Sequence, residues 1–295
     1  MLPILNRLSI PFPSTMRLPA PSTRTSALLL LGILPFAAPT AYILYLRLTT
    51  VRHIISSTGR YHPPTTDKSK SKPSSSTPAP PPPLPLTIPT HLSTSTSHTI
   101  MYERVTSHPT PLTSLNDAFS NPDTIPTLLL TTYLRTTMKA FSGTPQAYMI
   151  RSALNGHAAR TTFDNDHIDA LEFVPGDRVN GVYVVTYRGR GLAGWGERVE
   201  LRLEAPVGYT GAGREVEGMI VVGVEEVGDE REEEEKGERE REWEQEARSI
   251  LLVNETWLWR EEGGRPVMLE NVVGRWLHGL LAGWLVVKGL RAVTI

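Results

Sequence analysis

Alternating apolar and polar residues in the second half of the chain predict a series of β-strands. In the clearest of them, residues 197–204, Val199 and Leu201 face one way while Arg198 and Glu200 face the other. Further segments alternate in the same way or are rich in Val, Ile, Tyr and Trp: residues 100–106, 182–188, 219–227 and 250–259. Because the charged side suits water, the pattern indicates an antiparallel sheet with one solvated face.

Apolar residues at helical spacing predict helices between the first strand and the later ones. Ser114 is expected to cap a short helix that contains Leu115 and Phe119. Thr144 and Pro145 are a suitable N-cap and first residue for another helix. The helix between these two begins near Pro126, and its apolar residues are three or four positions apart: Leu130, Leu134, Met138 and Phe141.

The C-terminal residues 268–288 predict a long amphipathic helix. Its apolar side repeats at intervals of three and four: Leu269, Val273, Trp276, Leu280, Trp284 and Val287. Arg275 and His278 interrupt the run, and the uncharged stretch after His278 has only nine residues, too few to cross a bilayer. Gly279 and Gly283 form a GxxxG pattern, which predicts close packing of this helix on the sheet rather than helix pairing inside a membrane.

The order of these elements predicts an α+β domain over residues 100–295. Helices follow the first strand, an antiparallel meander comes next, and the long C-terminal helix packs across the sheet. This order is that of a helix-grip fold, in which a cavity forms between the last helix and a curved sheet. An NTF2-like cone is the alternative, and neither topology fixes a function.

Residues 25–46 form an uncharged run between Arg24 and Arg47 that is long enough to span a bilayer as a helix. Tyr45 lies near one end, where aromatic residues suit the membrane interface. A cleaved signal peptide and a buried soluble helix are the rival interpretations. The segment 1–24 has arginines and no acid, which is typical of a mitochondrial presequence or of the basic flank of a signal anchor. A single-pass protein of a mitochondrial or another endomembrane is therefore expected, with its orientation open.

Two polar segments are predicted to be disordered or solvated. Residues 47–99 are rich in Pro, Ser and Thr and predict a disordered tether, with a polyproline rod at residues 80–85. The rod is interpreted as a spacer, although such a run can also bind an SH3 or WW domain. Residues 228–247 are an acidic insertion, interpreted as a solvated loop or as a surface for a protein partner.

Composition excludes several kinds of chemistry. The chain has no cysteine, so it has no disulfide, no thiol nucleophile and no Cys-ligated zinc or iron–sulfur cluster. The net charge of −1 is a cancellation between a basic N-terminal segment and a downstream acidic one, so it says nothing about nucleic acid. No basic face with interleaved aromatics is present, which argues against nucleic-acid binding. No cofactor, metal ligand or catalytic residue is predicted. The support for an enzyme is one polar cluster that contains Arg151, His157, Asp164 and His167, and a polar loop explains it better.

The large aromatic residues of the last strand and helix are the candidate ligand-binding residues. If a cavity lies between the sheet and the final helix, its lining would be mostly apolar with few polar groups, as in small-molecule sites. The expected lining residues are Trp257, Trp259, Trp276, His278 and Trp284. The simpler interpretation of the tryptophans is ordinary core. The sequence favours a membrane-tethered, non-enzymatic domain that binds a lipid-like or apolar ligand. An assembly or protein-interaction factor and an enzyme of unknown class are the alternatives.

Several runs resemble those of uncharacterised membrane-anchored proteins of filamentous fungi. The similar runs are MYERVTSHPTPL, TTYLRTTMKAF, FVPGDRVNGVYVVTYRG, ETWLWR and GRWLHGLLAGWLVVKGLRAVT. The resemblance covers residues 100–295 and the anchor. It implies a single-pass membrane protein but no activity, and it assigns no catalytic residue.

Overall fold

The structure is a computed structural model that describes residues 23–61, 81–94, 97–119, 125–191, 196–210, 216–227 and 248–295. Within these stretches it describes the side chains from residue 37 onward, except that of Ile125. Most of the basic segment 1–24 and all of the acidic insertion 228–247 lie outside the described residues. So do the side chains in the first half of the predicted span 25–46.

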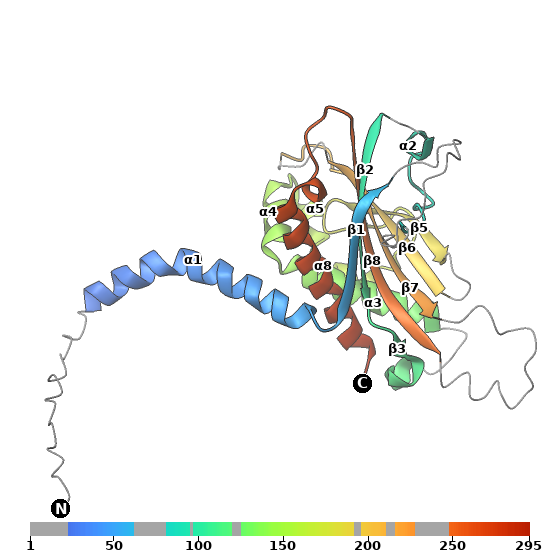
Figure 1. Ribbon diagram of the computed structural model, residues 1–295, viewed down its shortest axis with the longest axis horizontal. Helices are drawn as coiled ribbons and strands as arrows, with labels where there is room; N and C mark the ends of the chain where they lie inside the picture. Colours follow the sequence, from blue (N-terminus) through green and yellow to red (C-terminus); the bar gives the residue numbers. More distant parts are fainter. Residues whose placement is uncertain are drawn as a thin grey trace, which may run out of the picture. The chain divides into compact units, whose positions relative to one another are not determined.

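One antiparallel sheet is the framework of residues 45–295 (Figure 1). Its strands are β1 Ile54–Tyr61, β2 His98–Ser107, β3 Thr110–Pro111, β4 Arg178–Val179, β5 Tyr183–Arg190, β6 Gly196–Leu203, β7 Glu217–Val227 and β8 Ser249–Glu261. They lie in the order β1-β2-β8-β7-β6-β5-β4, and the short β3 also pairs with β8. Strands β4 to β8 form a meander, as predicted, and β2 then pairs with β8.

Helices precede and follow the meander, so the predicted α+β class with an antiparallel sheet and a C-terminal helix is confirmed. The described helices are α1 Thr23–Thr50, α2 Thr90–Thr94, α3 Ile125–Ser142, α4 Pro145–Ala153, α5 His157–Thr161, α6 Asn165–Ala170 and α8 Val272–Val293. Short 3-10 helices occupy Leu112–Ser114 (η1), Asp117–Phe119 (η2) and Met268–Glu270 (η3).

The two predicted helix caps have different outcomes. Thr144 caps α4 as expected, because its hydroxyl accepts a hydrogen bond from the backbone N–H of Ala147 at 3.2 Å. The predicted cap at Ser114 is wrong, since Ser114 ends η1 instead of starting a helix. The next residue, Leu115, is extended and forms an isolated bridge with Thr294, which takes the chain out of a helical path.

Helices α3 and α8 cover one face of the sheet, and glycines in α8 allow their close approach. A Cβ atom at Gly289 would lie 2.0 Å from a ring carbon of Tyr133 in α3. A Cβ atom at Gly283 would lie 2.3 Å from the end of the Ile54 side chain in β1. Both distances are far shorter than a carbon–carbon contact, so any larger residue would push α8 away. Small residues in α8 therefore serve its packing within the domain.

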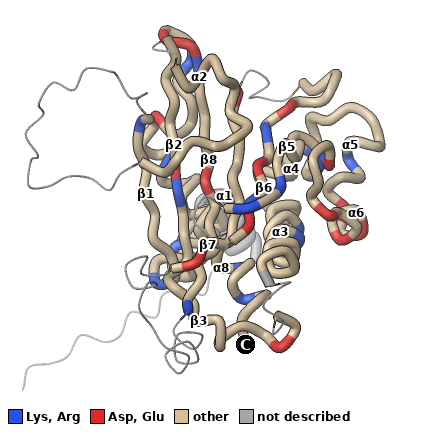
Figure 2. The backbone as a smooth tube through the Cα atoms, turned by 90° about the vertical axis from the view of Figure 1, so that its right-hand side faces the viewer, with Lys and Arg blue, Asp and Glu red and all other residues tan. Residues whose placement is uncertain are grey.

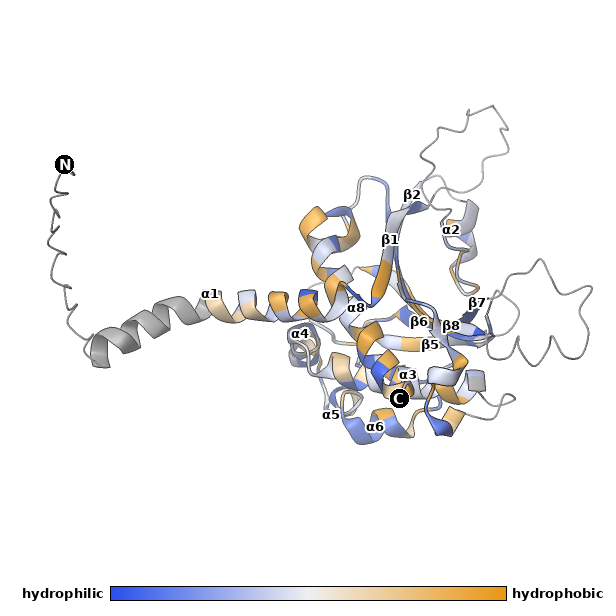
Figure 3. Ribbon diagram, turned by 60° about the horizontal axis from the view of Figure 1, so that its bottom comes forward, coloured by the Kyte–Doolittle hydropathy of each residue, from blue (hydrophilic) through white to orange (hydrophobic). Residues whose placement is uncertain are grey.

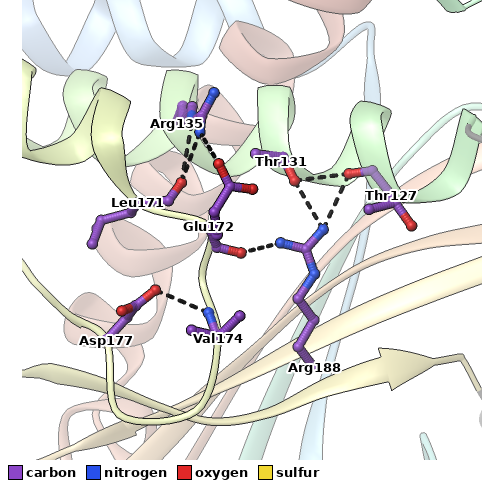
Figure 4. A network of polar contacts seen from close by, with 8 residues as sticks. All are labelled: Thr127, Thr131, Arg135, Leu171, Glu172, Val174, Asp177 and Arg188. Atoms are coloured by element: carbon purple, nitrogen blue, oxygen red, sulfur yellow. Dashed lines mark hydrogen bonds and ion pairs between the residues drawn. The ribbon is translucent and has the colours of Figure 1, made fainter.

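A polar network holds α3 against the loop that leads to β4 and against β5 (Figure 4). Arg188 in β5 donates hydrogen bonds to the backbone oxygen of Glu172 and to the hydroxyl of Thr131, the latter at 2.8 Å. Arg135 in α3 donates to the backbone oxygen of Leu171 at 2.9 Å and to the Glu172 carboxylate at 2.9 Å. These bonds fix the position of α3 over the sheet, where it forms one wall of the cavity described below.

The second face of the sheet is covered by residues 81–94, which we call the strap. The sequence predicts a disordered tether here and a solvated sheet face beneath it, and the structure contradicts both. Glu200 is fully buried and Arg198 is 6% exposed. The Glu200 carboxylate accepts hydrogen bonds from the backbone N–H groups of Leu86 at 2.7 Å and Thr87 at 2.8 Å, and from the Thr87 hydroxyl at 2.7 Å.

Apolar residues of the strap complete a second core on this face. Leu92 is fully buried, and Leu84 and Ile88 pack beside it. Their partners on the sheet are the apolar residues Ile100, Tyr102, Met219, Val221, Trp257 and Trp259. Figure 1 shows α2, at the end of the strap, on the side of the sheet away from α8.

Strand β1 also lies in the predicted tether, so the tether prediction is wrong for this part too. Only residues 51–53 separate the end of α1 at Thr50 from the start of β1 at Ile54. Strand β1 pairs along its whole length with β2, and Gly59 lies opposite Tyr102. The Tyr102 ring covers Gly59 so closely that a Cβ atom there would be 2.6 Å from the phenol oxygen. The domain therefore begins directly after α1, with no long spacer.

Among the residues that the structure describes, no helix is both long enough and apolar enough to cross a membrane.

Candidate functional site

A cavity lies between the sheet and the helices α3 and α8. Its volume is about 40 Å³. The sheet, α3 and α8 supply nearly all of its lining: Thr137, Met138, Phe141, Gln146, Tyr183, Ile220, Asn254, Thr256, His278, Leu281, Ala282 and Leu285. A mostly apolar wall with a few polar groups is typical of a site for a small molecule. Ligand pockets typically measure about 300–1,000 Å³, so this cavity can hold only one end of a ligand.

Three polar side chains form a hydrogen-bonded chain at this cavity. Glu103 in β2 is 3% exposed and its carboxylate bonds to Nδ1 of His278 in α8. On the other side of the ring, Nε2 of His278 lies 3.5 Å from the hydroxyl of Thr256 in β8. A carboxylate at Nδ1 fixes the ring so that Nε2 faces the hydroxyl and the cavity. The imidazole can therefore exchange a hydrogen bond or a proton with a ligand at Nε2.

Gly279 makes the contact between β2 and α8 possible. A Cβ atom at this position would lie 2.9 Å from Oε1 of Glu103. The buried carboxylate thus fits against the bare backbone of the helix, one residue after its imidazole partner. Gly279 and Gly283 both approach the sheet, which confirms that the GxxxG pattern serves packing inside the domain.

Tyr183 supplies a neutral phenol to the cavity wall. Burial, with a smaller contribution from Tyr209, raises the pKa of Tyr183 to about 12, compared with 10.0 for an exposed tyrosine. The folded state therefore favours the neutral phenol more strongly than the unfolded state does. This contribution to stability is complete below pH 10, and it is lost as the pH rises from 10 to about 12.

We expect the Tyr183→Phe variant to lose less stability than the wild type between pH 9 and pH 12, because phenylalanine has no proton to lose. Denaturant unfolding of both proteins at several pH values measures the difference. Burial also raises the pKa of Tyr133, so part of the alkaline destabilisation should remain in the variant. Equal pH slopes for the two proteins would contradict the assignment to Tyr183.

The predicted ligand-binding residues do not meet at one site, and only His278 lines the cavity. Trp257 and Trp259 are buried on the opposite face, under the strap, so their assignment to this cavity is wrong. Trp276 is 46% exposed and belongs to neither core. Trp284 is half-buried, and its indole N–H donates to the hydroxyl of Tyr45 at 3.3 Å.

Glu103, Asn254 and Thr256 were not predicted as site residues, although the sequence contains a signal for them. Glu103 alternates with Met101 and Val105, so it is a charged residue on an apolar side of β2. Asn254 and Thr256 likewise continue the apolar side of β8 that starts at Ile250 and Leu252. A polar residue on the apolar side of a strand is a useful indicator of a buried polar site.

The polar cluster around His157 does not converge on the cavity. Arg151 pairs with Asp164 at 2.9 Å in an exposed ion pair. The ring of His167 bonds to the backbone oxygen of Arg178 at 3.0 Å, and His157 is exposed. In the described part of the chain, no group of three or more His, Asp and Glu side chains is arranged to hold a metal ion. This cluster therefore supports no active site.

A second charged cluster lies on the strap side of the sheet, on neighbouring strands (Figure 2). Arg104 pairs with Glu225 at 2.5 Å and with Glu255. Burial raises the pKa of the Glu255 carboxyl, against the opposing effect of Arg104. Its other oxygen accepts a hydrogen bond from the indole N–H of Trp257 at 3.0 Å. Arg104, Glu225 and Glu255 are therefore all paired within the cluster, which indicates that the cluster stabilises the sheet.

Comparison of the chain with protein-family models, with curated proteins and with solved structures finds no match. The resemblance to membrane-anchored fungal proteins therefore stays a prediction, and the case for a function rests on the cavity.

Proposed function

We propose that this chain is a membrane-anchored binding domain for a small, largely apolar ligand that carries one hydroxyl group. The helix at residues 25–46 holds it in a mitochondrial or another endomembrane. The domain has a helix-grip arrangement, with an NTF2-like cone as the alternative, and the ligand binds between the sheet and α8. The observation that carries the proposal is a cavity lined by apolar and uncharged polar side chains, with one imidazole, His278, oriented by the buried Glu103.

The chemistry of the hydrogen-bonded chain supports a hydroxyl group on the ligand. When the imidazole is neutral and donates from Nδ1 to Glu103, Nε2 is left as an acceptor. The Thr256 hydroxyl, 3.5 Å away, is at the outer limit of a hydrogen bond, so it competes weakly for Nε2. A ligand hydroxyl could donate to Nε2 while its apolar part contacts Met138, Leu281 and neighbouring residues. Such a match of one polar group to an apolar wall provides orientation and specificity.

The proposal predicts that hexanol binds to the cavity and that hexane, which lacks the hydroxyl, binds more weakly. The full chain in lipid nanodiscs, labelled at its methionine methyl groups, allows binding to be followed by NMR. Met138 lines the cavity, so its signal should shift on titration with hexanol. Met149, which is 64% exposed in α4, is the internal control and should not shift. Replacing His278 by Gln should weaken hexanol binding about fivefold, the value of one neutral hydrogen bond.

Two results would contradict the binding proposal. The first is an unchanged Met138 signal at saturating hexanol. The second is equal binding by the Ala282→Leu variant, because the larger side chain should fill the cavity whose wall contains Ala282. If the cavity binds neither probe and membrane crosslinking recovers a stoichiometric protein partner, the assembly-factor alternative would be favoured.

A further inference from the structure

An exposed apolar patch lies at the end of α1 and along the N-terminal half of α8. Figure 3 shows apolar residues along the end of α1 and along α8. Several of them are exposed to solvent. The patch consists of exposed residues at the end of α1, namely Tyr45, Leu48 and Val51, and of exposed residues in α8, namely Val272, Val273, Trp276 and Leu277. We call these residues the anchor-proximal patch. So many large exposed apolar residues on two neighbouring elements indicate an interaction surface.

Contacts between α1 and α8 place the two halves of the patch on one surface. Trp284 donates a hydrogen bond to Tyr45, and Gly283 packs against Thr50 and Ile54. Leu277 and Val273 lie seven and eleven residues before Trp284, so they project from nearly the same side of α8, about 10 and 17 Å nearer its N-terminus. The patch therefore extends from the end of α1 along the first turns of α8.

The charged residues of the two segments that carry the patch are all basic. Residues 45–53 and the whole of α8 contain no Asp or Glu. They contain instead Arg47, Arg52, Arg275, Lys288 and Arg291. None of these five makes an ion pair with a described carboxylate. Aromatic residues at an apolar surface with basic neighbours are typical of a helix that lies in the headgroup region of a membrane.

Chain length places this surface next to the proposed anchor. The span at residues 25–46 ends at Leu46, so Leu48 and Val51 follow it by two and five residues. No spacer separates them, because β1 starts at Ile54. We propose that the anchor-proximal patch inserts into the headgroup region of an anionic bilayer and holds the domain against the membrane. This inference rests on the proposed anchor.

The absence of cysteine from the sequence provides a direct test. A single cysteine is introduced at Val273 in the full chain and labelled with an environment-sensitive fluorophore. The matched control is Leu86→Cys, at a residue that is 55% exposed on the strap, on the opposite side of the sheet. Both proteins are reconstituted in vesicles of phosphatidylcholine and phosphatidylserine. Nitroxide-labelled lipid should quench the fluorophore at position 273 and leave that at position 86 unchanged, and Leu277→Glu should reduce the quenching at position 273.

The outcomes separate this inference from the proposals on which it rests. A label at position 273 that iodide quenches from the water as efficiently as the control would overturn the membrane contact. The label at position 273 could instead be shielded from both quenchers, while the unlabelled cysteine at that position crosslinks two copies of the chain. Those results would show that the patch contacts a second copy of the chain and not the bilayer. Alkaline extraction tests the anchor on its own, because a protein released from the vesicles has no span. The hexanol titration tests the cavity independently of both.

Discussion

Replacing Trp257 by alanine is expected to destabilise the domain by about 3–5 kcal/mol, whereas the same change at Trp276 should cost about 0.5 kcal/mol or less. The side chain of Trp257 in β8 is fully buried under the strap, and its indole N–H donates a hydrogen bond to the buried Glu255. Its removal leaves a cavity and an acceptor without its donor. Trp276 is 46% exposed and has little packing to lose.

Thermal unfolding of the full chain in one detergent measures the two variants side by side. The Trp257 variant should melt many degrees below the wild type, and the Trp276 variant should melt within a few degrees of it. The pair is a matched control, since both changes remove the same number of atoms. Similar melting temperatures for the two variants would mean that the strap does not form a second core with Trp257.

The elements with local patterns could be predicted from the sequence. The alternation around Val199 and Leu201 corresponds to β6, because a strand with one apolar side shows its period directly. The Thr144 and Pro145 pair likewise predicts the start of α4, since a cap needs only its own neighbours. In each case the structural cause lies within a few residues of the signal.

The strap and β1 could not be predicted because distant residues order them. The Glu200 carboxylate holds the backbone N–H groups of Leu86 and Thr87 from more than 100 positions away in the sequence. The few apolar residues of the strap, such as the buried Leu92, pack only against strands that lie elsewhere in the chain. Gly59 in β1 has no side chain that could pack, and the ring of Tyr102 in the neighbouring strand β2 covers it. A polar, proline-rich composition predicts disorder only when no such partner exists elsewhere in the chain.

The candidate site could be predicted in part. His278 was indicated by its position in an otherwise apolar helix, but the tryptophans of β8 were placed on the wrong face. Both sides of β8 carry apolar residues, so alternation alone could not show that α8 covers the side of Asn254 and Thr256. The opposite side of β8, which includes Trp257, is buried by the strap, and the strap was not predicted to fold.

The strap depends on one buried carboxylate, so Glu200→Ala is expected to have a second large effect. The change removes the acceptor of three hydrogen bonds from Leu86 and Thr87, and it leaves the 6% exposed Arg198 without the carboxylate 2.8 Å away. Breaking a buried pair on one side costs about 3–5 kcal/mol. The matched control is Glu204→Ala in the loop that follows β6, whose ion pairs with Arg178 and Arg202 lie at the surface and contribute about 1 kcal/mol or less each.

Hydrogen exchange of the full chain shows whether that loss passes through the strap. In the Glu200 variant the amides of Leu86 and Thr87 should exchange much faster than in the wild type, and protection at Leu92 should fall with them, because the strap opens as a unit. Thr87→Val removes the hydroxyl bonds to Glu200 and Thr186 but keeps both backbone N–H bonds to Glu200, so it should produce a smaller effect at the same residues. The Glu204 variant should leave exchange in the strap unchanged. A lower melting temperature for Glu200→Ala with normal protection at residues 84–92 would show that Glu200 stabilises the sheet alone, and that the Pro-rich segment is not held by it.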